Sequence, residues 1–223
     1  MALPRPGDAA DRRDAPRPRL DRPVAAPRAG VGSVASVKPV ERLVARVQDW
    51  LFMHREYVPD RRVLEDVILP ALLERADVQR VLFVGCAWYT RRYVPAFAGR
   101  ELWTLDVDPE QARYGAPRHV VDSLANLGTH VAPGRLDAIV CNGVIGYGLD
   151  DPADIETAVA ACFDALRGGG LLVLGVDDSA PVAVADIAAL ARFAPVAPPP
   201  FPASRYPTFS ATGHTFHFHA RPA

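Results

Sequence analysis

The sequence predicts an α/β protein built on a doubly wound, mostly parallel β-sheet. Three observations support this: short apolar runs typical of strands covered on both faces, helical segments between them, and a polar or glycine residue directly after each run. Strands that alternate with helices in this way form a parallel sheet with right-handed crossovers. The chain has 223 residues, 49% of them hydrophobic, which suffices for one domain with a sizeable core.

The N-terminal part differs from the rest of the chain. Residues 1–36 are rich in Arg, Asp and Pro and lack Phe, Tyr, Trp and Ile, so we predict a disordered tail. A helical cap is predicted for residues 37–78, before a sheet domain at 79–223. Apolar residues recur at helical spacing in 40–51 and again in 63–76, so the cap is expected to contain two helices.

Six strands are predicted directly from the residue pattern. Five apolar runs are expected to form the parallel part of the sheet, at 80–85, 101–106, 119–121, 136–141 and 171–176. The last strand, 214–220, alternates in polarity and follows a proline-rich connection at 195–207, so we expect it to run antiparallel.

Helices are expected between these strands, at 89–97, 109–114, 123–130, 152–166 and 182–193. Pro109 suits the first turn of the second of these helices. The run from Gly168 to Gly170 is expected to end the fourth.

Composition bounds the partners and the setting. The net charge of −1 gives no electrostatic reason to expect nucleic acid or an anionic membrane as a partner. The three cysteines form no C-x-x-C pair, which argues against a disulfide framework and a zinc site. No apolar run is long enough to span a membrane, and the N-terminus lacks the apolar region of a secretion signal. A cytoplasmic setting and a small-molecule substrate are therefore expected.

Polar residues follow the predicted strands, where ligands bind in doubly wound sheets. These residues are Gly85, Cys86 and Ala87; Asp106 and Asp108; Asp122 and Ser123; Asn142 and Gly143; and Asp177 and Asp178. A carboxylate after the second strand can accept both ribose hydroxyls of an adenosine. Asp106 lies 21 residues beyond Gly85, the spacing of one βαβ unit. Asp122 can reach the exocyclic amine of an adenine, or it can instead cap a helix.

Taken together and in the order in which they occur, these motifs make residues 80 to about 176 resemble the class I S-adenosylmethionine-dependent methyltransferase domain. The fold of that family is a Rossmann-like sheet of seven strands with an antiparallel last strand. The resemblance rests on VLFVGCA, TLDVDPE, the Asp of HVVDS, LDAIVCNGVIGYG and LRGGGLLVLG. It implies S-adenosylmethionine as the cofactor. The residues that it implies for binding this cofactor are Gly85, Cys86, Ala87, Asp106, Val107, Asp122, Ser123, Asn142 and Gly143.

The turn after the first strand departs from the family pattern. Phe83 occupies a position where the family often has an acid that supports the methionine end of the cofactor. Ala87 and Tyr89 replace the second and third glycines. Trp88, Tyr89 and Tyr93 could enclose a sulfonium through cation–π contacts, or they could pack against the N-terminal helices.

Three functions are weighed on this basis. The first is methyl transfer from S-adenosylmethionine to an oxygen or nitrogen of a small molecule, with Asp177 and His54 as candidate general bases. The second is a domain that has kept the fold and lost the chemistry, and serves as a binding or assembly module. The third is an NAD(P)-dependent oxidoreductase, which GCAWYT at 85–90 disfavours because two glycines of G-x-G-x-x-G are missing.

The histidines of the last strand are not expected to bind metal. His217 and His219 share one face of the strand, and His214 faces the other way with Phe216 and Phe218. No third ligand lies nearby in the sequence. We therefore expect these histidines to face solvent or a helix.

Overall fold

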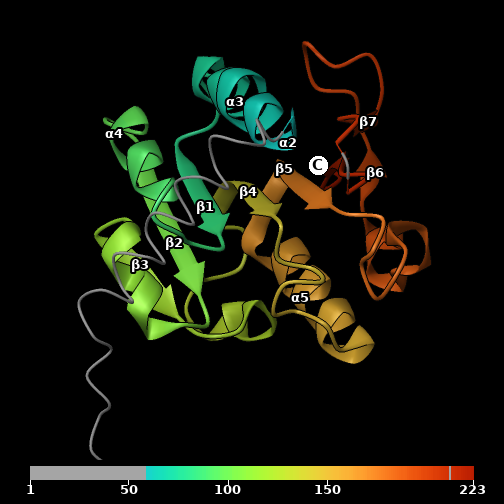
Figure 1. The fold of residues 1–223 in the computed structure, drawn as a ribbon. Coiled ribbons are helices and arrows are strands. Elements are labelled where there is room, and N and C mark those ends of the chain that lie inside the picture. Colours follow the sequence, from blue (N-terminus) through green and yellow to red (C-terminus); the bar gives the residue numbers. More distant parts are fainter. Residues whose placement is uncertain (1–58, 211) are drawn as a thin grey trace, which may run out of the picture. The chain divides into compact units, whose positions relative to one another are not determined.

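The computed structural model describes residues 59–210 and 212–223. The sheet has eight strands in the order β3-β2-β1-β4-β5-β8-β6, with β7 also paired to β8 (Figure 1). The strands are β1 (Arg80–Val84), β2 (Glu101–Asp106), β3 (Arg118–Val121), β4 (Leu136–Asn142), β5 (Leu166–Val176), β6 (Ala194–Pro195), β7 (Arg205–Pro207) and β8 (Thr215–Ala220). The first five pair in parallel and β8 runs antiparallel to β5, which confirms the predicted fold class.

Several of the expected features lie outside the described residues: the tail at 1–36, the helix at 40–51 and His54. The described helices are α2 (Pro59–Val63), α3 (Leu69–Glu74), α4 (Tyr93–Ala96) and α5 (Pro152–Ala165), with a π-helical turn at Leu64–Ile68 between α2 and α3. None of these helices in the described part of the chain has the length and apolar character needed to cross a bilayer.

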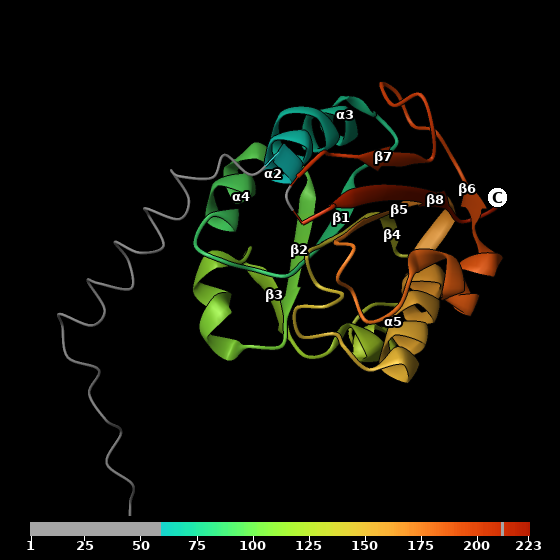
Figure 2. The same cartoon turned by 45° about the vertical axis from the view of Figure 1, so that its right-hand side comes forward.

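The sheet lies between two layers of helical segments, because alternate residues of its central strands face opposite sides. Figure 2 shows α2, α3 and α4 on one side of the sheet and α5 on the other. The strand residues that face α5 include Leu82, Val84, Ile139 and Leu172. Those that face α3 and α4 include Val81, Phe83, Val140 and Val173. Burial on both faces explains why the strands are continuous apolar runs in the sequence.

The helix expected at 63–76 begins earlier and contains a widened turn. It runs from Pro59 to Glu74 through the π-helical segment, in which the Leu69 N–H bonds to the Leu64 carbonyl five residues back. Pro70 has no N–H to continue a regular ladder of hydrogen bonds, and a π turn accommodates this break.

The helix predicted at 182–193 is wrong. The structure has two short 3₁₀-helices there, Val184–Asp186 and Ala188–Arg192, separated by Ile187 in an extended conformation. The Ile187 side chain is buried in the core. The carboxylate of Glu156 on α5 accepts the N–H groups of Ala188 and Ala189, so an interaction from a distant helix caps the second turn. The segments predicted as helices at 109–114 and 123–130 are also 3₁₀-helices, Pro109–Tyr114 and Leu124–Thr129.

The glycine run does not end a helix as predicted. Helix α5 ends at Ala165, and β5 begins at the next residue, so all three glycines lie within the strand. Gly169 has φ +73°, and a Cβ on Gly170 would lie 2.9 Å from the carbonyl oxygen of Arg167. The pairing of β4 with β5 also shifts its register between Leu136 and Ala138. The glycines therefore allow an irregular first half of β5.

The sheet has eight strands and not seven because two short parts of the proline-rich connection also pair with β8. These are β6 and β7, both antiparallel to β8. A pairing of two or three residues leaves no alternation in the sequence from which it could be predicted.

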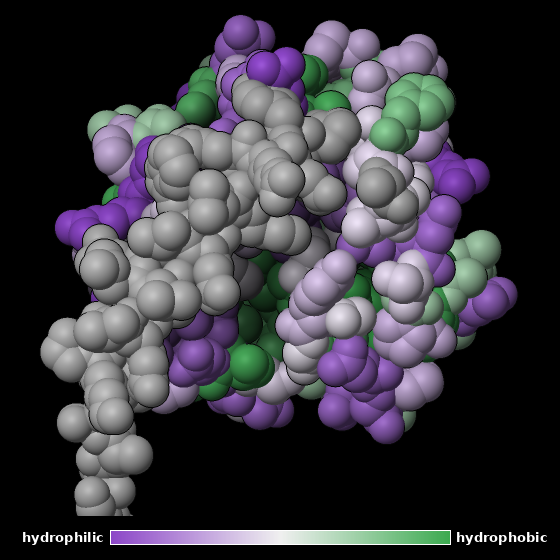
Figure 3. Space-filling view, in the orientation of Figure 1, coloured by the Kyte–Doolittle hydropathy of each residue, from purple (hydrophilic) through white to green (hydrophobic). Residues whose placement is uncertain are grey.

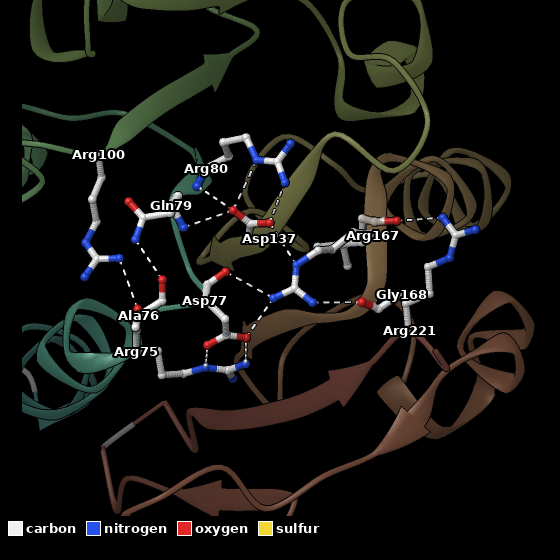
Figure 4. Close-up of polar contacts among 11 residues, drawn as sticks. Arg75, Ala76, Asp77, Gln79, Arg80, Arg100, Asp137, Arg167, Gly168 and Arg221 are labelled. Carbon is white, nitrogen blue, oxygen red and sulfur yellow. Dashed lines mark hydrogen bonds and ion pairs between the residues drawn. The ribbon is translucent and has the colours of Figure 1, made fainter.

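A buried carboxylate joins the amino ends of the three central strands (Figure 4). Asp137 on β4 is 2% exposed and accepts the backbone N–H groups of Gln79 and Arg80 at 2.9 and 2.8 Å. It also pairs with the guanidinium groups of Arg80 at 2.8 Å and Arg167 at 2.9 Å. Burial would raise the pKa of Asp137, but the hydrogen bonds from Arg80 and Gln79 lower it to about 2. One side chain thus links β1, β4 and β5.

We expect Asp137→Ala to lower the free energy of unfolding by about 3–5 kcal/mol, because it leaves two guanidinium groups and two backbone donors without their acceptor. Urea unfolding measures this loss. The matched control is Asp77→Ala, which removes an exposed partner of Arg167 and Arg75 and should change the free energy by at most about 1 kcal/mol. Equal losses in the two variants would contradict this role of Asp137.

Candidate active site

A cavity of about 430 Å³ opens at the carboxyl ends of β1, β2, β4 and β5. Figure 3 shows a hollow floored by apolar side chains, with hydrophilic side chains on its rim. Seven of the nine residues predicted to bind the cofactor line this cavity: Gly85, Cys86, Asp106, Val107, Ser123, Asn142 and Gly143. Asp177, predicted as a general base, lines it as well. Ala87 and Asp122 are not among the lining residues.

The turn after β1 holds the Asp106 carboxylate in place. Gly85 has φ +85°, a conformation that L side chains rarely adopt. The N–H of Cys86 donates to Asp106 Oδ2 at 2.6 Å, and the N–H of Asp108 donates to Oδ1 at 2.9 Å. Each carboxylate oxygen keeps acceptor capacity beyond these bonds. Asp106 is therefore fixed at the cavity wall as an acceptor.

The Cys86 thiol beside this carboxylate is not a nucleophile at neutral pH. Burial, followed by the charge of Asp106, raises the pKa of the thiol to about 11. Cys86 therefore contributes its backbone N–H and its packing to the site.

Of the two residues that replace the glycines, Tyr89 lines the cavity without filling it, and Ala87 is not in its wall. Tyr89 and Thr90 are in its wall, while Trp88 is 45% exposed and is not. The Trp88 and Tyr89 rings meet edge to face at 5.7 Å. Ala87 forms a short turn with Thr90, whose hydroxyl accepts the Ala87 N–H and donates to the Ala87 carbonyl. Trp88 and Tyr89, in the turn after β1, therefore leave this end of the cavity open.

Asp122 is occupied by local contacts. Its carboxylate accepts the N–H of Ser123, the amide of Asn126 at 2.7 Å and the Nε2 of His130 at 2.7 Å. These bonds, that of His130 first, lower the pKa of Asp122 to about 2. The following 3₁₀-helix is capped by Ser123, whose hydroxyl accepts the N–H of Ala125, so the alternative that Asp122 caps it is wrong. A role of Asp122 toward adenine stays a prediction. Its neighbour Ser123 reaches the cavity.

The opposite wall contains a hydrogen-bonded group centred on His214. This histidine is 2% exposed, and its Nδ1 lies 2.5 Å from Asp177 Oδ1. Its Nε2 lies 3.0 Å from Asn142 Oδ1. Asp177 also accepts the hydroxyl of Tyr147 at 2.7 Å and that of Thr212 at 3.1 Å. All five residues line the cavity.

This group places a proton between Asp177 and His214. Burial would raise the pKa of Asp177, but the bonds from Tyr147 and His214 hold it below its ordinary value. A carboxylate accepts a hydrogen bond, so His214 Nδ1 carries a proton. The Asn142 atom that faces Nε2 is Oδ1, an acceptor, so Nε2 donates to it and the ring is an imidazolium in this arrangement. The ring is neutral when the Asn142 amide is turned so that its N–H donates to Nε2. In the neutral form Nε2 is basic.

The expectation that His214 faces solvent or a helix is wrong. One pattern could have indicated this contact: Asp177 directly follows the fifth predicted strand, and His214 lies at the start of the last one. Since β8 pairs antiparallel with β5, and Val176 faces Thr215, the next residue of each strand follows on the same side: Asp177 and His214. Sequence reasoning also missed Asp60, Arg61 and Leu64, which bring the first turns of the N-terminal helix into the cavity wall.

His217 and His219, the two histidines of β8, are not among the residues that line this cavity. Burial lowers the pKa of His217 to about 4 and also lowers that of His219. Within the described ranges, no three His, Cys, Asp or Glu side chains come together in a group that could hold a metal ion.

Neither a protein-family model nor a curated protein sequence matches this chain. Solved structures do. The N-methyltransferase NodS from Bradyrhizobium japonicum WM9 is 22% identical, with 74% of this chain and 98% of that chain covered and a TM-score of 0.57. A TehB-like SAM-dependent methyltransferase from Corynebacterium glutamicum is 17% identical, with 81% and 98% covered and a TM-score of 0.54. The magnesium protoporphyrin IX methyltransferase ChlM from Synechocystis, with bound SAM, is 16% identical, with 70% and 77% covered and a TM-score of 0.52.

The chain has the class I methyltransferase fold. At these identities the likeness establishes the fold alone, and it confirms the architecture that the resemblance of residues 80–176 implied. In this fold the described cavity lies at the carboxyl ends of the parallel strands, where doubly wound sheets bind their ligands.

We expect Gly175→Ala to disrupt the His214 group. A Cβ on Gly175 would lie 2.0 Å from Asn142 Oδ1 and 2.7 Å from His214 Nε2, so one of these buried side chains must move and lose its hydrogen bond. Urea unfolding should show a loss of about 1–3 kcal/mol. In the control Gly128→Ala, nothing lies within 4 Å of the added Cβ, and the change should stay within about 0.5 kcal/mol. A tolerated Gly175→Ala would show that the group repacks freely.

Proposed function

We propose that this protein transfers a methyl group from S-adenosylmethionine to an oxygen or nitrogen atom of a small molecule. The observation that carries the proposal is the Asp106 carboxylate, held at the end of β2 by two backbone N–H groups and directed to a cavity that also contains Gly85. This arrangement suits a ribose whose two hydroxyls donate to one carboxylate. NodS has also been solved with S-adenosyl-L-homocysteine, which supports the same class of ligand.

The residues present fit this cofactor along the length of the cavity. Gly85 and Cys86 would lie against the methionine part of the cofactor, and Asp106 would bind its ribose. Val107 would pack on the adenine ring, with Ser123 at the edge of that ring. Asn142 and Gly143 would lie where the methyl group meets the acceptor. When bound, S-adenosylmethionine supplies an activated methyl group on a sulfonium. The chain supplies alignment, which is the main requirement of methyl transfer.

His214 is the proposed general base, which removes a proton from the substrate atom that receives the methyl group. In the neutral ring, Nε2 would take the proton that the acceptor oxygen or nitrogen loses when the bound acceptor replaces Asn142 as its hydrogen-bond partner, while Asp177 holds the ring through Nδ1. Asp177, the base predicted from the sequence, would then act through His214. His54 lies outside the described residues, and its role stays a prediction.

The size and charge of the site favour a small acceptor. A cavity of about 430 Å³ falls within the usual range for small-molecule sites. The net charge of −1 provides no attraction for nucleic acid. The helical cap and the connection at 195–213 are the proposed substrate lids.

The hypothesis of an inactive module rested on the missing glycines and on Phe83, and it would be favoured if Trp88 and Tyr89 filled the cavity. Tyr89 lines a cavity that stays open, and Trp88 is outside its wall. This geometry supports the enzyme over the module. The oxidoreductase hypothesis is not supported. Ala87 and Tyr89 stand where a dinucleotide-binding turn has glycines, so a pyrophosphate could not come close to the backbone there.

We expect S-adenosylmethionine and S-adenosylhomocysteine to bind the purified chain, and Asp106→Ala to weaken both by at least about tenfold because the ribose hydroxyls lose their acceptor. Isothermal calorimetry measures this. Asp108→Ala is the matched control, since Asp108 caps the neighbouring 3₁₀-helix and is not among the residues that line the cavity. Absence of heat with both ligands would refute the proposed function.

We expect His214→Gln and Asp177→Asn to lower turnover by about a hundredfold or more while the affinity for S-adenosylmethionine changes little, because both act on the acceptor's proton. The readout is S-adenosylhomocysteine formed with a panel of phenols, catechols and amines. The control is His217→Gln, which changes a histidine of β8 that is not among the cavity-lining residues. Unchanged turnover in the His214 variant with an accepted substrate would remove it from the mechanism.

A further inference from the structure

The described walls of the cavity contain two charged residues that the proposed function has not used. Asp60 and Arg61 belong to α2, ahead of the sheet, and line the cavity beside Phe83, Tyr89 and Tyr93. Phe83 is the β1 residue at which the resemblance implies an acid that supports the methionine end of the cofactor. The carboxylate that is absent from β1 at Phe83 is therefore matched by that of Asp60 on α2, in the wall of the same cavity.

Asp60 has an unsatisfied acceptor. Its Oδ1 is buried and has no hydrogen-bond partner among the described residues. Leaving a carboxylate oxygen buried without a donor lowers stability, so such a group in a native structure requires an explanation. Because Asp60 is in the wall of the cavity, a donor on a bound ligand would satisfy this oxygen.

The other acid of this helical segment that contacts the turn after β1 already has its partners. Glu65 pairs with Arg92 and accepts the hydroxyl of Tyr93 at 2.6 Å. The ring of Tyr93 in turn packs edge to face on Phe83 at 5.3 Å. Glu65 therefore fixes the aromatic part of the wall, and its charge is balanced within the protein. Asp60 forms no such ion pair within the described part of the chain.

Arg61 is oriented by the residue that replaces the third glycine. Its guanidinium carbon lies 3.6 Å from the centroid of the Tyr89 ring. A guanidinium stacked on an aromatic ring keeps its N–H donors in the plane of the fork, the geometry that binds a carboxylate through two hydrogen bonds. Tyr89 thereby provides a surface on which Arg61 stacks within the cavity wall.

We propose that Asp60 and Arg61 bind the amino-acid end of the cofactor, Asp60 accepting from the α-ammonium group and Arg61 donating to the α-carboxylate. The inference rests on the proposed function and assigns the residues that recognise this end of the ligand. The proposal accounts for two departures from the family pattern. Asp60 on α2 supplies the acid that is absent at Phe83, and Tyr89 supports Arg61, which binds the other charged group of the ligand.

The test compares two nucleosides on the full chain by calorimetry: S-adenosylhomocysteine, and methylthioadenosine, which has the same adenosine and sulfur but no amino-acid end. The wild-type chain should bind S-adenosylhomocysteine at least about tenfold more tightly. Asp60→Asn and Arg61→Gln should each weaken S-adenosylhomocysteine at least about tenfold and leave methylthioadenosine within about twofold.

The same helical segment provides matched controls. Asp66→Asn and Arg62→Gln remove one charge each from exposed residues that are not among those lining the cavity, and should leave both affinities unchanged. Thermal melting checks that each variant is folded.

The possible outcomes separate the two ideas. Equal weakening of both nucleosides by Asp60→Asn and Arg61→Gln, or no effect on either, would overturn the assignment while the proposed function stands. Failure of the wild-type chain to bind either nucleoside would instead refute the proposed function, and this inference with it.

Discussion

The buried Asp137 carboxylate is the constraint on which the geometry of this sheet depends. It accepts the backbone N–H groups of Gln79, just before β1, and of Arg80, the first residue of β1, and it pairs with Arg167 near the start of β5. Three adjacent parallel strands thus share one fixed point at their amino ends. Strand register then decides where each strand stops. Val84 lies opposite Cys141, and Asn142 lies opposite Gly175. These pairings align the strand ends that form the cavity.

The acids in the cavity wall differ in how they are satisfied, and this difference divides the site. Asp106 is held by backbone donors, which position it and leave acceptor capacity for hydroxyls. Asp177 is held by side chains and shares a proton with His214. Asp60 has a buried oxygen without a donor in the described residues. The three environments suit three tasks: to bind a neutral polyol, to orient a base, and to pair with a positive charge.

Much of the fold could be predicted because its signals are local. Apolar runs gave the parallel strands, and the spacing of apolar residues gave α5, which Asp151 caps at its first turn. The errors have a common cause. The helix expected at 182–193 is divided by a buried Ile187 and a cap from Glu156, and the glycine run belongs to a strand that pairs with β4. These elements depend on contacts with distant parts of the chain, which local propensity does not contain.

The candidate site also combines features that the sequence predicts with features that depend on tertiary contacts. The sequence by itself determined the fold class, the position of Gly85 at the first turn and that of Asp106 one βαβ unit later, because a parallel sheet brings its strand ends to one edge whatever the details of packing. Only the tertiary structure decided that His214 meets Asp177 and Asn142, residues 37 and 72 positions away in the chain, and that α2 brings Asp60 and Arg61 to the same cavity. The physical reason is that residue periodicity encodes which face of an element is buried, whereas the meeting of side chains from different elements is set by strand register and by packing between layers.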